Sequence, residues 1–161
     1  SKSKVRSIKQ AVLLLGLAEL RKWMYLLAMR EARLDMEKDT TKEIMLSSLF
    51  RAKICEKLAN YKSEQNHAEY FLIGLFSLID AILERPLPNI LQQLPFREEI
   101  VETISGVDTY MTPYLNISIA LNKGEWSEAE TLADKLKIPY DIVMQYYEEV
   151  NEWVKDSLNK N

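Results

Sequence analysis

His67 and Cys55 are the only imidazole and the only thiol in this chain of 161 residues. A metal site built from several imidazoles is therefore excluded within the chain, and so is an internal disulfide. A metal-dependent phosphohydrolase on a helical scaffold would need several His and Asp ligands, among them an adjacent His-Asp pair. We interpret His67 as a solvated or helix-capping residue and Cys55 as a small core residue.

Other catalytic patterns are also missing from the sequence. The glycines at positions 16, 74, 106 and 124 are too far apart to form a phosphate-binding loop. A serine nucleophile needs a base, and His67 is the only histidine that could supply one. Counting residues leaves a Ser-Lys or a purely carboxylate mechanism open, but no spacing points to either. We therefore expect no catalytic residue, no metal and no cofactor, and we predict that the chain is not an enzyme.

One carboxylate lies inside an apolar segment. Asp80 is the only ionisable residue between Phe71 and Leu83. A buried carboxylate must be hydrogen-bonded, paired or neutral. Asp80 is thus a candidate ligand-contact or switch residue. The interpretation we favour is a structural anchor bonded to backbone donors or to an arginine, for which Arg51 and Arg85 are candidates.

The composition indicates which elements must position these residues. Only four glycines and five prolines occur, which favours long helices over many short strands. The net charge of −3 gives no basic surface for nucleic acid or for an anionic membrane. The most apolar stretch, from Tyr70 to Leu83, is shorter than the roughly 20 residues that cross a bilayer. With no signal peptide at the start, a cytoplasmic location is the default expectation.

We predict an all-α fold, a compact bundle of about eight helices around a central apolar helix at roughly 66–84. The first two helices are expected at 7–15, stopped by Gly16, and at 17–27. Thr40 and Glu43 have the spacing of a capping box for the third. Its apolar stripe is Met45, Leu49, Ala52, Cys55 and Ala59, with Arg51 outward or at the rim.

Ser63 is expected to open the central helix, which is apolar nearly all round and should therefore have neighbours on most sides. Shorter helices are predicted at 89–94 and 97–104. Longer ones should follow from about Thr109 with Pro113 in the first turn, at 127–136, and from residue 139 or 140 to about 158.

Two C-terminal features allow alternative interpretations. Residues 120–129 resemble the helix-turn-helix junction of tetratricopeptide arrays, although no second copy of the phrase occurs. A helical-repeat interaction scaffold is therefore kept as an alternative. An aromatic group near the C-terminus could form a partner surface, but packing onto the chain's own core is favoured; its members are Tyr140, Tyr146, Tyr147 and Trp153.

Three short sequence motifs resemble those of a known protein family. Residues 7–16 (SIKQAVLLLG), followed by 20–23 (LRKW), resemble a phrase of HDOD domains, the HD-related output domains of bacterial signalling proteins. Residues 68–80 (AEYFLIGLFSLID) are similar to the helix that carries "GLLHDIG" in catalytic HD relatives. Laid against that helix, Ser77 stands at the His position, Leu78 at the Asp position, and Ser47 near an earlier His position. The resemblance therefore implies a degenerate metal site without its ligands.

The resemblance extends from Val5 to about Trp153 and is greatest to HDOD domains that follow an EAL domain, the cyclic di-GMP phosphodiesterase module. It implies a bundle of HD-domain-like type and a non-catalytic regulatory domain that controls an attached EAL or other signalling domain, with a homodimer as a further expected assembly. In the family, apolar helices precede the Ser-Ile phrase, so we expect residues 1–161 to be a single domain lacking its first helices, a C-terminal fragment. A phosphohydrolase whose ligands lie outside this fragment is the other alternative.

Overall fold

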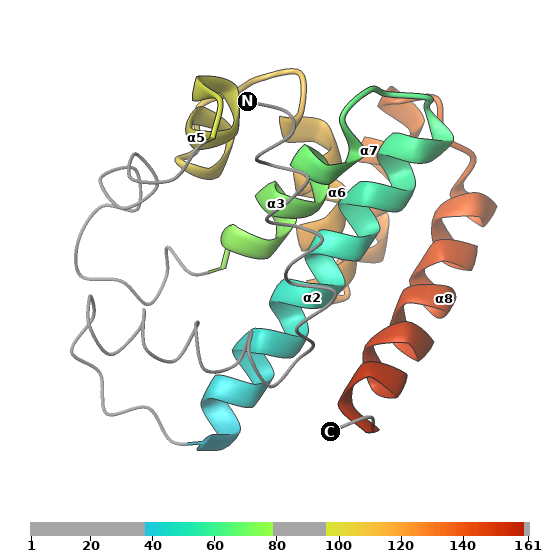
Figure 1. Cartoon of the computed structure of the whole chain (residues 1–161). Helices are drawn as coiled ribbons and strands as arrows, with labels where there is room; N and C mark the ends of the chain where they lie inside the picture. The colour runs from blue at the N-terminus through green and yellow to red at the C-terminus, as the bar shows by residue number, and fades with distance from the viewer. Residues whose placement is uncertain (1–37, 79–95, 160–161) are drawn as a thin grey trace.

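The computed structural model describes residues 38–78 and 96–159, and the side chains of 43–78 and 96–156 (Figure 1). Within these ranges the chain has six α-helices and no strand, which confirms the all-α prediction. The expected count of about eight helices is not matched. The helices predicted at 7–15, 17–27 and 89–94 lie outside the described residues, as do Asp80 and Arg85.

Helix α2 (Lys38–Tyr61) presents the predicted apolar stripe to the core. All five stripe residues are buried: Met45, Leu49, Ala52, Cys55 and Ala59. The prediction of its start was wrong, because the helix begins at Lys38 and Thr40 lies inside its first turn. Lys38 and Asp39 are already helical, so Thr40 is not the N-cap of this helix.

Helix α3 (His67–Phe76) is the buried centre of the described structure (Figure 1). Every residue from Ala68 to Phe76 is buried, as the all-round apolar pattern predicted. It packs most extensively against α2, and also against α5 (Glu98–Ile104) and α6 (Thr112–Lys123). A helix enclosed in this way fits a bundle better than a row of stacked helix pairs.

The predicted bounds of the central helix were too wide at both ends. Ser63 and Asn66 have left-handed backbone angles, φ 57° and 63°, so the helix cannot begin before His67. At the other end, helix α3 stops at Phe76 and Ser77 and Leu78 lie in a turn. The Ser77 hydroxyl donates to the Gly74 carbonyl over 2.9 Å, a local bond that competes with helix continuation.

Gly74 allows α3 to lie directly on the backbone of α2. A Cβ atom at this position would stand 2.5 Å from the Arg51 carbonyl oxygen and 2.6 Å from Ala52 backbone atoms. No side chain fits in that space. The glycine is therefore required by the close approach of the two helices rather than by its own backbone angles.

The remaining helices lie close to their predicted ranges, except that α6 begins at Thr112 and not near Thr109. They are α5 (Glu98–Ile104), α6 (Thr112–Lys123), α7 (Trp126–Lys135) and α8 (Tyr140–Asn159). Gly106, with φ 96°, follows α5, and Gly124, with φ 72°, caps α6. Pro113 stands in the first turn of α6, where its missing N–H costs no hydrogen bond.

Helix α8 lies along α2 and also contacts α7 (Figure 1). Its aromatic side chains are partly buried against the core, as the favoured interpretation predicted; they are Tyr140, Tyr146, Tyr147 and Trp153. Lys57 on α2 joins Glu149 on α8 over 2.9 Å. Among the described helices, none combines the length and the apolar character that a bilayer span requires.

Candidate functional site

Two of the positions that the resemblance to HD relatives singles out, Ser47 and Ser77, lie beside one arginine, Arg51. Ser77, directly after α3, accepts a hydrogen bond from Arg51 Nη1 at 3.4 Å. Ser47 precedes Arg51 by four residues on α2, so the two side chains are neighbours on one helix face. Leu78 is half-buried in the turn beside Ser77. The alignment to catalytic HD relatives thus picked out residues that share one region of the structure.

Arg51 is buried, contrary to the prediction that it points outward or lies at the rim. Its exposed fraction is 6%, and its Nε donates to Asn122 Oδ1 on α6 over 2.9 Å. Burial lowers the pKa of the Arg51 guanidinium, but an arginine side chain remains charged at neutral pH. A permanent cation therefore stands between α2, the end of α3 and the end of α6.

This arrangement does not suit a divalent metal ion. Ser47 and Ser77 offer hydroxyls, which bind divalent metals less well than the imidazoles that the resemblance would place there, and the Arg51 cation would repel a second cation beside it. Within residues 43–78 and 96–156, no group of three or more His, Cys, Asp or Glu side chains is placed to hold a metal. The site chemistry that remains is hydrogen bonding and the attraction of negative charge.

The sequence did not predict that Arg51 is buried or that it hydrogen-bonds to Asn122. The available signal was an arginine between Phe50 and Ala52, four residues after Ser47, on a helix face that is otherwise apolar or small. His67 begins α3 and is partly exposed, which agrees with its interpretation as a solvated residue. Asp80 and its pairing with an arginine lie outside the described residues and stay a prediction.

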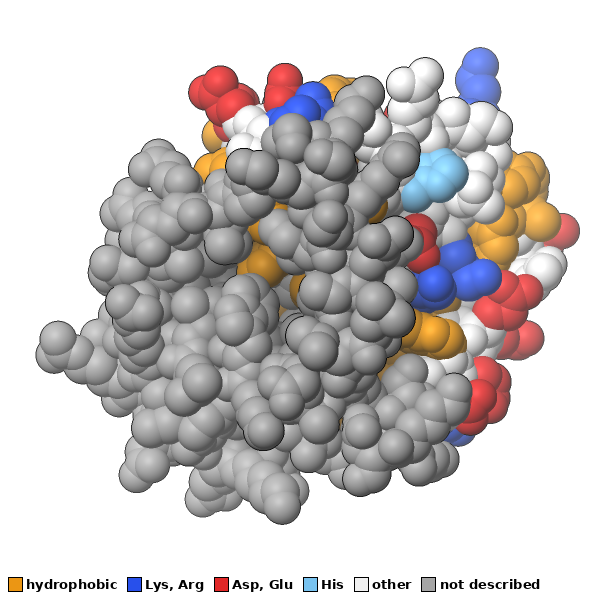
Figure 2. Space-filling view, viewed as in Figure 1, with side chains coloured by type: hydrophobic (Ala, Val, Ile, Leu, Met, Phe, Trp, Pro, Cys, Tyr) orange, Lys and Arg blue, Asp and Glu red, His pale blue; other side chains and the backbone are white. Residues whose placement is uncertain are grey.

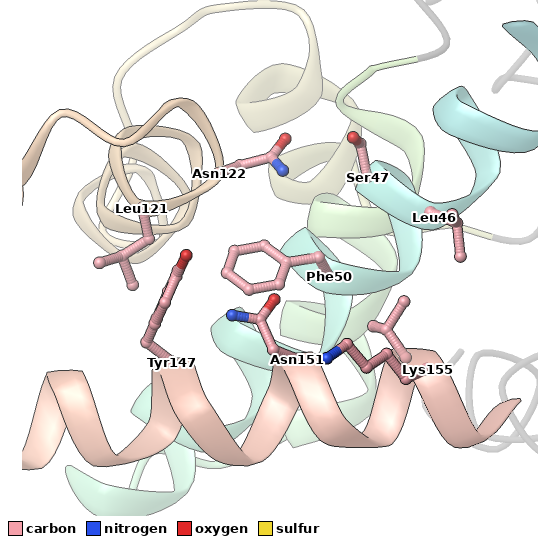
Figure 3. Close-up of a pocket in the computed structure, with 9 residues that line it drawn as sticks. Leu46, Ser47, Phe50, Leu121, Asn122, Tyr147, Asn151 and Lys155 are labelled. Atoms are coloured by element: carbon pink, nitrogen blue, oxygen red, sulfur yellow. The ribbon is translucent and has the colours of Figure 1, made fainter.

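A pocket of about 240 Å³ adjoins this arginine, between α2, α6 and α8 (Figure 3). It is lined by Leu46, Ser47, Phe50, Leu121, Asn122, Tyr147, Asn151, Val154 and Lys155. In Figure 3 the side chains of Tyr147, Asn151 and Lys155 rise from α8 toward α2 and the end of α6. Polar groups from three helices therefore converge over an apolar base.

Aromatic contacts hold the walls of the pocket. The rings of Phe50 and Tyr147 meet edge to face with centroids 5.7 Å apart. Trp126 packs against the same Tyr147 ring at 5.0 Å and is itself largely exposed at the start of α7. The Phe50–Tyr147 pair therefore joins α2 to α8 at the pocket, and the Trp126–Tyr147 pair joins α7 to α8.

A second polar cluster joins the start of α3 to α5. Arg97 donates from Nε to Glu69 Oε2 at 2.6 Å and from Nη2 to Glu69 Oε1 at 2.5 Å. Arg97 also contacts Glu99 at 3.3 Å and the Tyr110 hydroxyl at 3.0 Å. The hydrogen bonds to Glu69 raise the pKa of Arg97, so this pair is a stable structural clamp.

Charged side chains of both signs lie on the part of the visible face that the described residues form. Figure 2 shows acidic and basic side chains interspersed over the described part of one face. This mixture fits the small net charge of the chain. A face of this kind offers no stripe of basic residues to a nucleic acid backbone.

Comparison with known proteins gives one family match and two curated relatives. The sequence model of the HDOD domain matches residues 1–95. The chain is 34% identical over 151 residues to the protein YuxH of Bacillus subtilis (strain 168), covering 93% of this chain and 36% of that protein. It is 27% identical over 153 residues to the cyclic di-GMP phosphodiesterase CdgJ of Vibrio cholerae serotype O1, covering 94% of this chain and 34% of that protein.

The matches cover only part of the relatives, and the family model covers only part of the pocket. The chain spans about a third of the length of the curated relatives it matches. No solved structure matches it significantly. The pocket takes Leu46, Ser47 and Phe50 from the part that the domain model matches, and its other lining residues from beyond residue 95.

Proposed function

The chain belongs to the HDOD family, and we propose that it is a regulatory output domain that acts through protein contacts and catalyses no reaction of its own. The family identification agrees with the resemblance of residues 7–16, 20–23 and 68–80. HDOD domains are linked to bacterial cyclic di-GMP signalling through relatives such as CdgJ. A cytoplasmic location is part of this proposal.

The observation that carries the proposal is the environment of Arg51. Its guanidinium hydrogen-bonds to Ser77 and Asn122, and the resemblance to HD relatives assigns Ser77 to the position of a metal-binding histidine. The Arg51 cation with its two neutral partners connects α2 to the end of α3 and to the end of α6. The region is thus suited to transmitting a change in helix position rather than to activating water.

The partner we propose is a signalling domain of the same polypeptide, and specifically an EAL domain. CdgJ is a cyclic di-GMP phosphodiesterase, and this chain corresponds to about a third of its length. A domain of this size can control a neighbouring catalytic domain by changing the contact between them. A homodimer is the second assembly we propose, and sedimentation equilibrium of the chain measures it directly.

The first test separates regulation from catalysis. The isolated chain is incubated with Mn²⁺ or Mg²⁺ and with cyclic di-GMP and a panel of nucleotides. We expect no metal-dependent hydrolysis. Turnover that depends on the metal and scales with the concentration of the chain would contradict the proposal and favour the phosphohydrolase alternative.

The second test uses the natural polypeptide that carries this chain. Rates of cyclic di-GMP hydrolysis are compared between the unaltered protein and Arg51→Met, with Lys135→Met, an exposed change on α7, as the matched control. Regulation through this domain predicts a change of about fivefold or more for Arg51→Met. Equal rates in all three proteins, each shown to be folded by circular dichroism, would contradict the proposal.

A further inference from the structure

We propose that the pocket between α2, α6 and α8 is a binding site for a small organic anion, a flat apolar body that carries one carboxylate or phosphate group. This inference depends on the pocket alone and holds whether or not an EAL domain is the partner. Its basis is the size of the pocket, the donors that line it and the sign of the charge around it.

The size of the pocket limits the ligand. About 240 Å³ lies just below the range of roughly 300–1,000 Å³ that is usual for ligand sites. The apolar base comes from Phe50, Leu121 and Val154, with the edge of Tyr147 beside it. A single ring system fits such a base, because flat apolar bodies bury well against aromatic and aliphatic side chains.

The donors converge from three helices. Asn122 has its Oδ1 occupied by Arg51 Nε, which directs the amide N–H groups of the same side chain to other acceptors. Asn151 and Lys155 have no hydrogen-bond or ion-pair partner within the part of the chain that the structure describes. In Figure 3 the Asn151 side chain is directed toward Phe50 of α2, and the Lys155 side chain extends along α8 toward Asn151. A ligand with acceptor oxygens would satisfy them.

The charge around the pocket favours an anion. Lys155 is the one charged residue among the nine that line it, and Arg51 stands directly behind Asn122. The guanidinium withdraws electron density through Asn122 Oδ1 and so strengthens the donor character of the Asn122 N–H groups. Glu152 and Asp156, the acidic neighbours of the lining positions on α8, are exposed and do not line the pocket.

The test is an NMR titration of the full chain of 161 residues labelled with ¹⁵N. Phenyl phosphate and benzoate serve as anionic probes, and benzamide is the neutral probe of the same shape. The side-chain amide signals of Asn122 and Asn151 are the readout. We expect both anions to shift these signals saturably, with dissociation constants at or below about 1 mM, and benzamide to bind about fivefold more weakly.

Variants assign the charge preference to one residue. Lys155→Met should weaken benzoate and phenyl phosphate by about fivefold and leave benzamide unchanged. Lys135→Met, an exposed lysine on α7 away from the pocket, should leave all three probes unchanged. Both sites are exposed, so both variants are expected to fold.

Three results would each overturn the proposal. The first is the absence of a saturable shift of the two amide signals up to about 10 mM probe. The second is equal affinity for benzoate and benzamide, because it removes the anion preference. The third is equal weakening by Lys155→Met and Lys135→Met, because it moves the charge effect away from the pocket.

Discussion

The two ends of helix α3 are each held by an arginine, but in opposite electrostatic states. At the start of the helix, Arg97 forms a bidentate ion pair with the buried Glu69, and the pKa of Arg97 is raised. At the end, Arg51 has only the neutral Asn122 and Ser77 as hydrogen-bond partners among the described residues, and its pKa is lowered by burial. The start of the helix is therefore held by an ion pair, whereas the cation at its end is bonded only to neutral groups among the described residues.

The difference indicates where the domain can change. A buried carboxylate paired with arginine is costly to separate, so the α3–α5 contact should stay fixed. The hydrogen bonds from the Arg51 guanidinium go to neutral acceptors, so they can be exchanged for others at a smaller cost in free energy than the separation of a buried ion pair. We therefore expect a rearrangement of this domain to occur at the end of α3 rather than at its start.

The largest expected effect comes from breaking the fixed end. Arg97→Leu leaves the Glu69 carboxylate, 2% exposed, without a cation. The free energy of unfolding should fall by about 3–5 kcal/mol, measured by urea denaturation. Glu99→Gln, which removes only an exposed partner of the same arginine, should cost less than about 1 kcal/mol. Similar losses for the two variants would show that the start of α3 is not held by charge.

A smaller loss is expected from Gly74→Ala, near the other end. The new methyl group would stand 2.5 Å from the Arg51 carbonyl oxygen, so α2 and α3 must separate. We expect a loss of about 1–3 kcal/mol in the same denaturation experiment. Gly106→Ala serves as a comparison, because its surroundings are open and only its φ of 96° opposes a side chain. Its cost should be about 1 kcal/mol, and a larger cost than Gly74→Ala would argue against close helix contact.

Alkaline pH probes the core one turn beyond Arg51. Burial raises the pKa of Cys55 from 9.0 to about 12. In the unfolded chain the thiol loses its proton from about pH 9. In the folded chain the thiol keeps its proton up to about pH 12. The free energy of unfolding should therefore fall as the pH rises from 9 to 12, by about 1.4 kcal/mol per pH unit for this proton.

Cys55→Ala isolates that contribution, since it removes the thiol while the tyrosines remain. Denaturation series at several pH values give the slope of stability against pH for both proteins. The variant should have the shallower slope above pH 9, whatever its stability at neutral pH. Parallel slopes would show that Cys55 ionises with little cost in the folded state.

Apart from the control variants, Arg51→Met should have the smallest effect of these substitutions on the free energy of unfolding. It tests the comparison of the two arginines directly. The variant loses hydrogen bonds to two neutral groups and is relieved of the cost of burying a charge. We expect a net loss of about 1 kcal/mol. A loss as large as that of Arg97→Leu would mean that Arg51 has a carboxylate partner, and the predicted pairing with Asp80 would then be the first to examine.

Local patterns in the sequence predicted much of this fold. The apolar stripe of α2 and the stops at Gly106 and Gly124 depend on neighbours within a few turns, and the structure confirms them. The all-round apolar pattern likewise predicted that α3 is enclosed. The early end of α3 was missed because the Ser77 bond to Gly74 competes with a pattern that otherwise favours helix.

The candidate site was predicted less completely. The alignment located Ser47, Ser77 and Leu78, whose functional assignment stays a prediction. It did not predict that Arg51 is buried, because the Asn122 that fixes it lies 71 residues away. A contact at that distance leaves no periodic signal in the sequence.

Because α8 packs against α2, one side of α2 can be covered only after the C-terminal helix has been synthesised. Phe50 leaves the ribosome long before Tyr147, its partner across the pocket. At translation rates of about 5–20 residues per second, the interval between the end of α2 and the start of α8 lasts roughly 4–16 s. In that time one apolar flank of α2 lacks its final cover, which makes the nascent chain a substrate for chaperones. A chain cut short before residue 140 would keep that flank permanently uncovered.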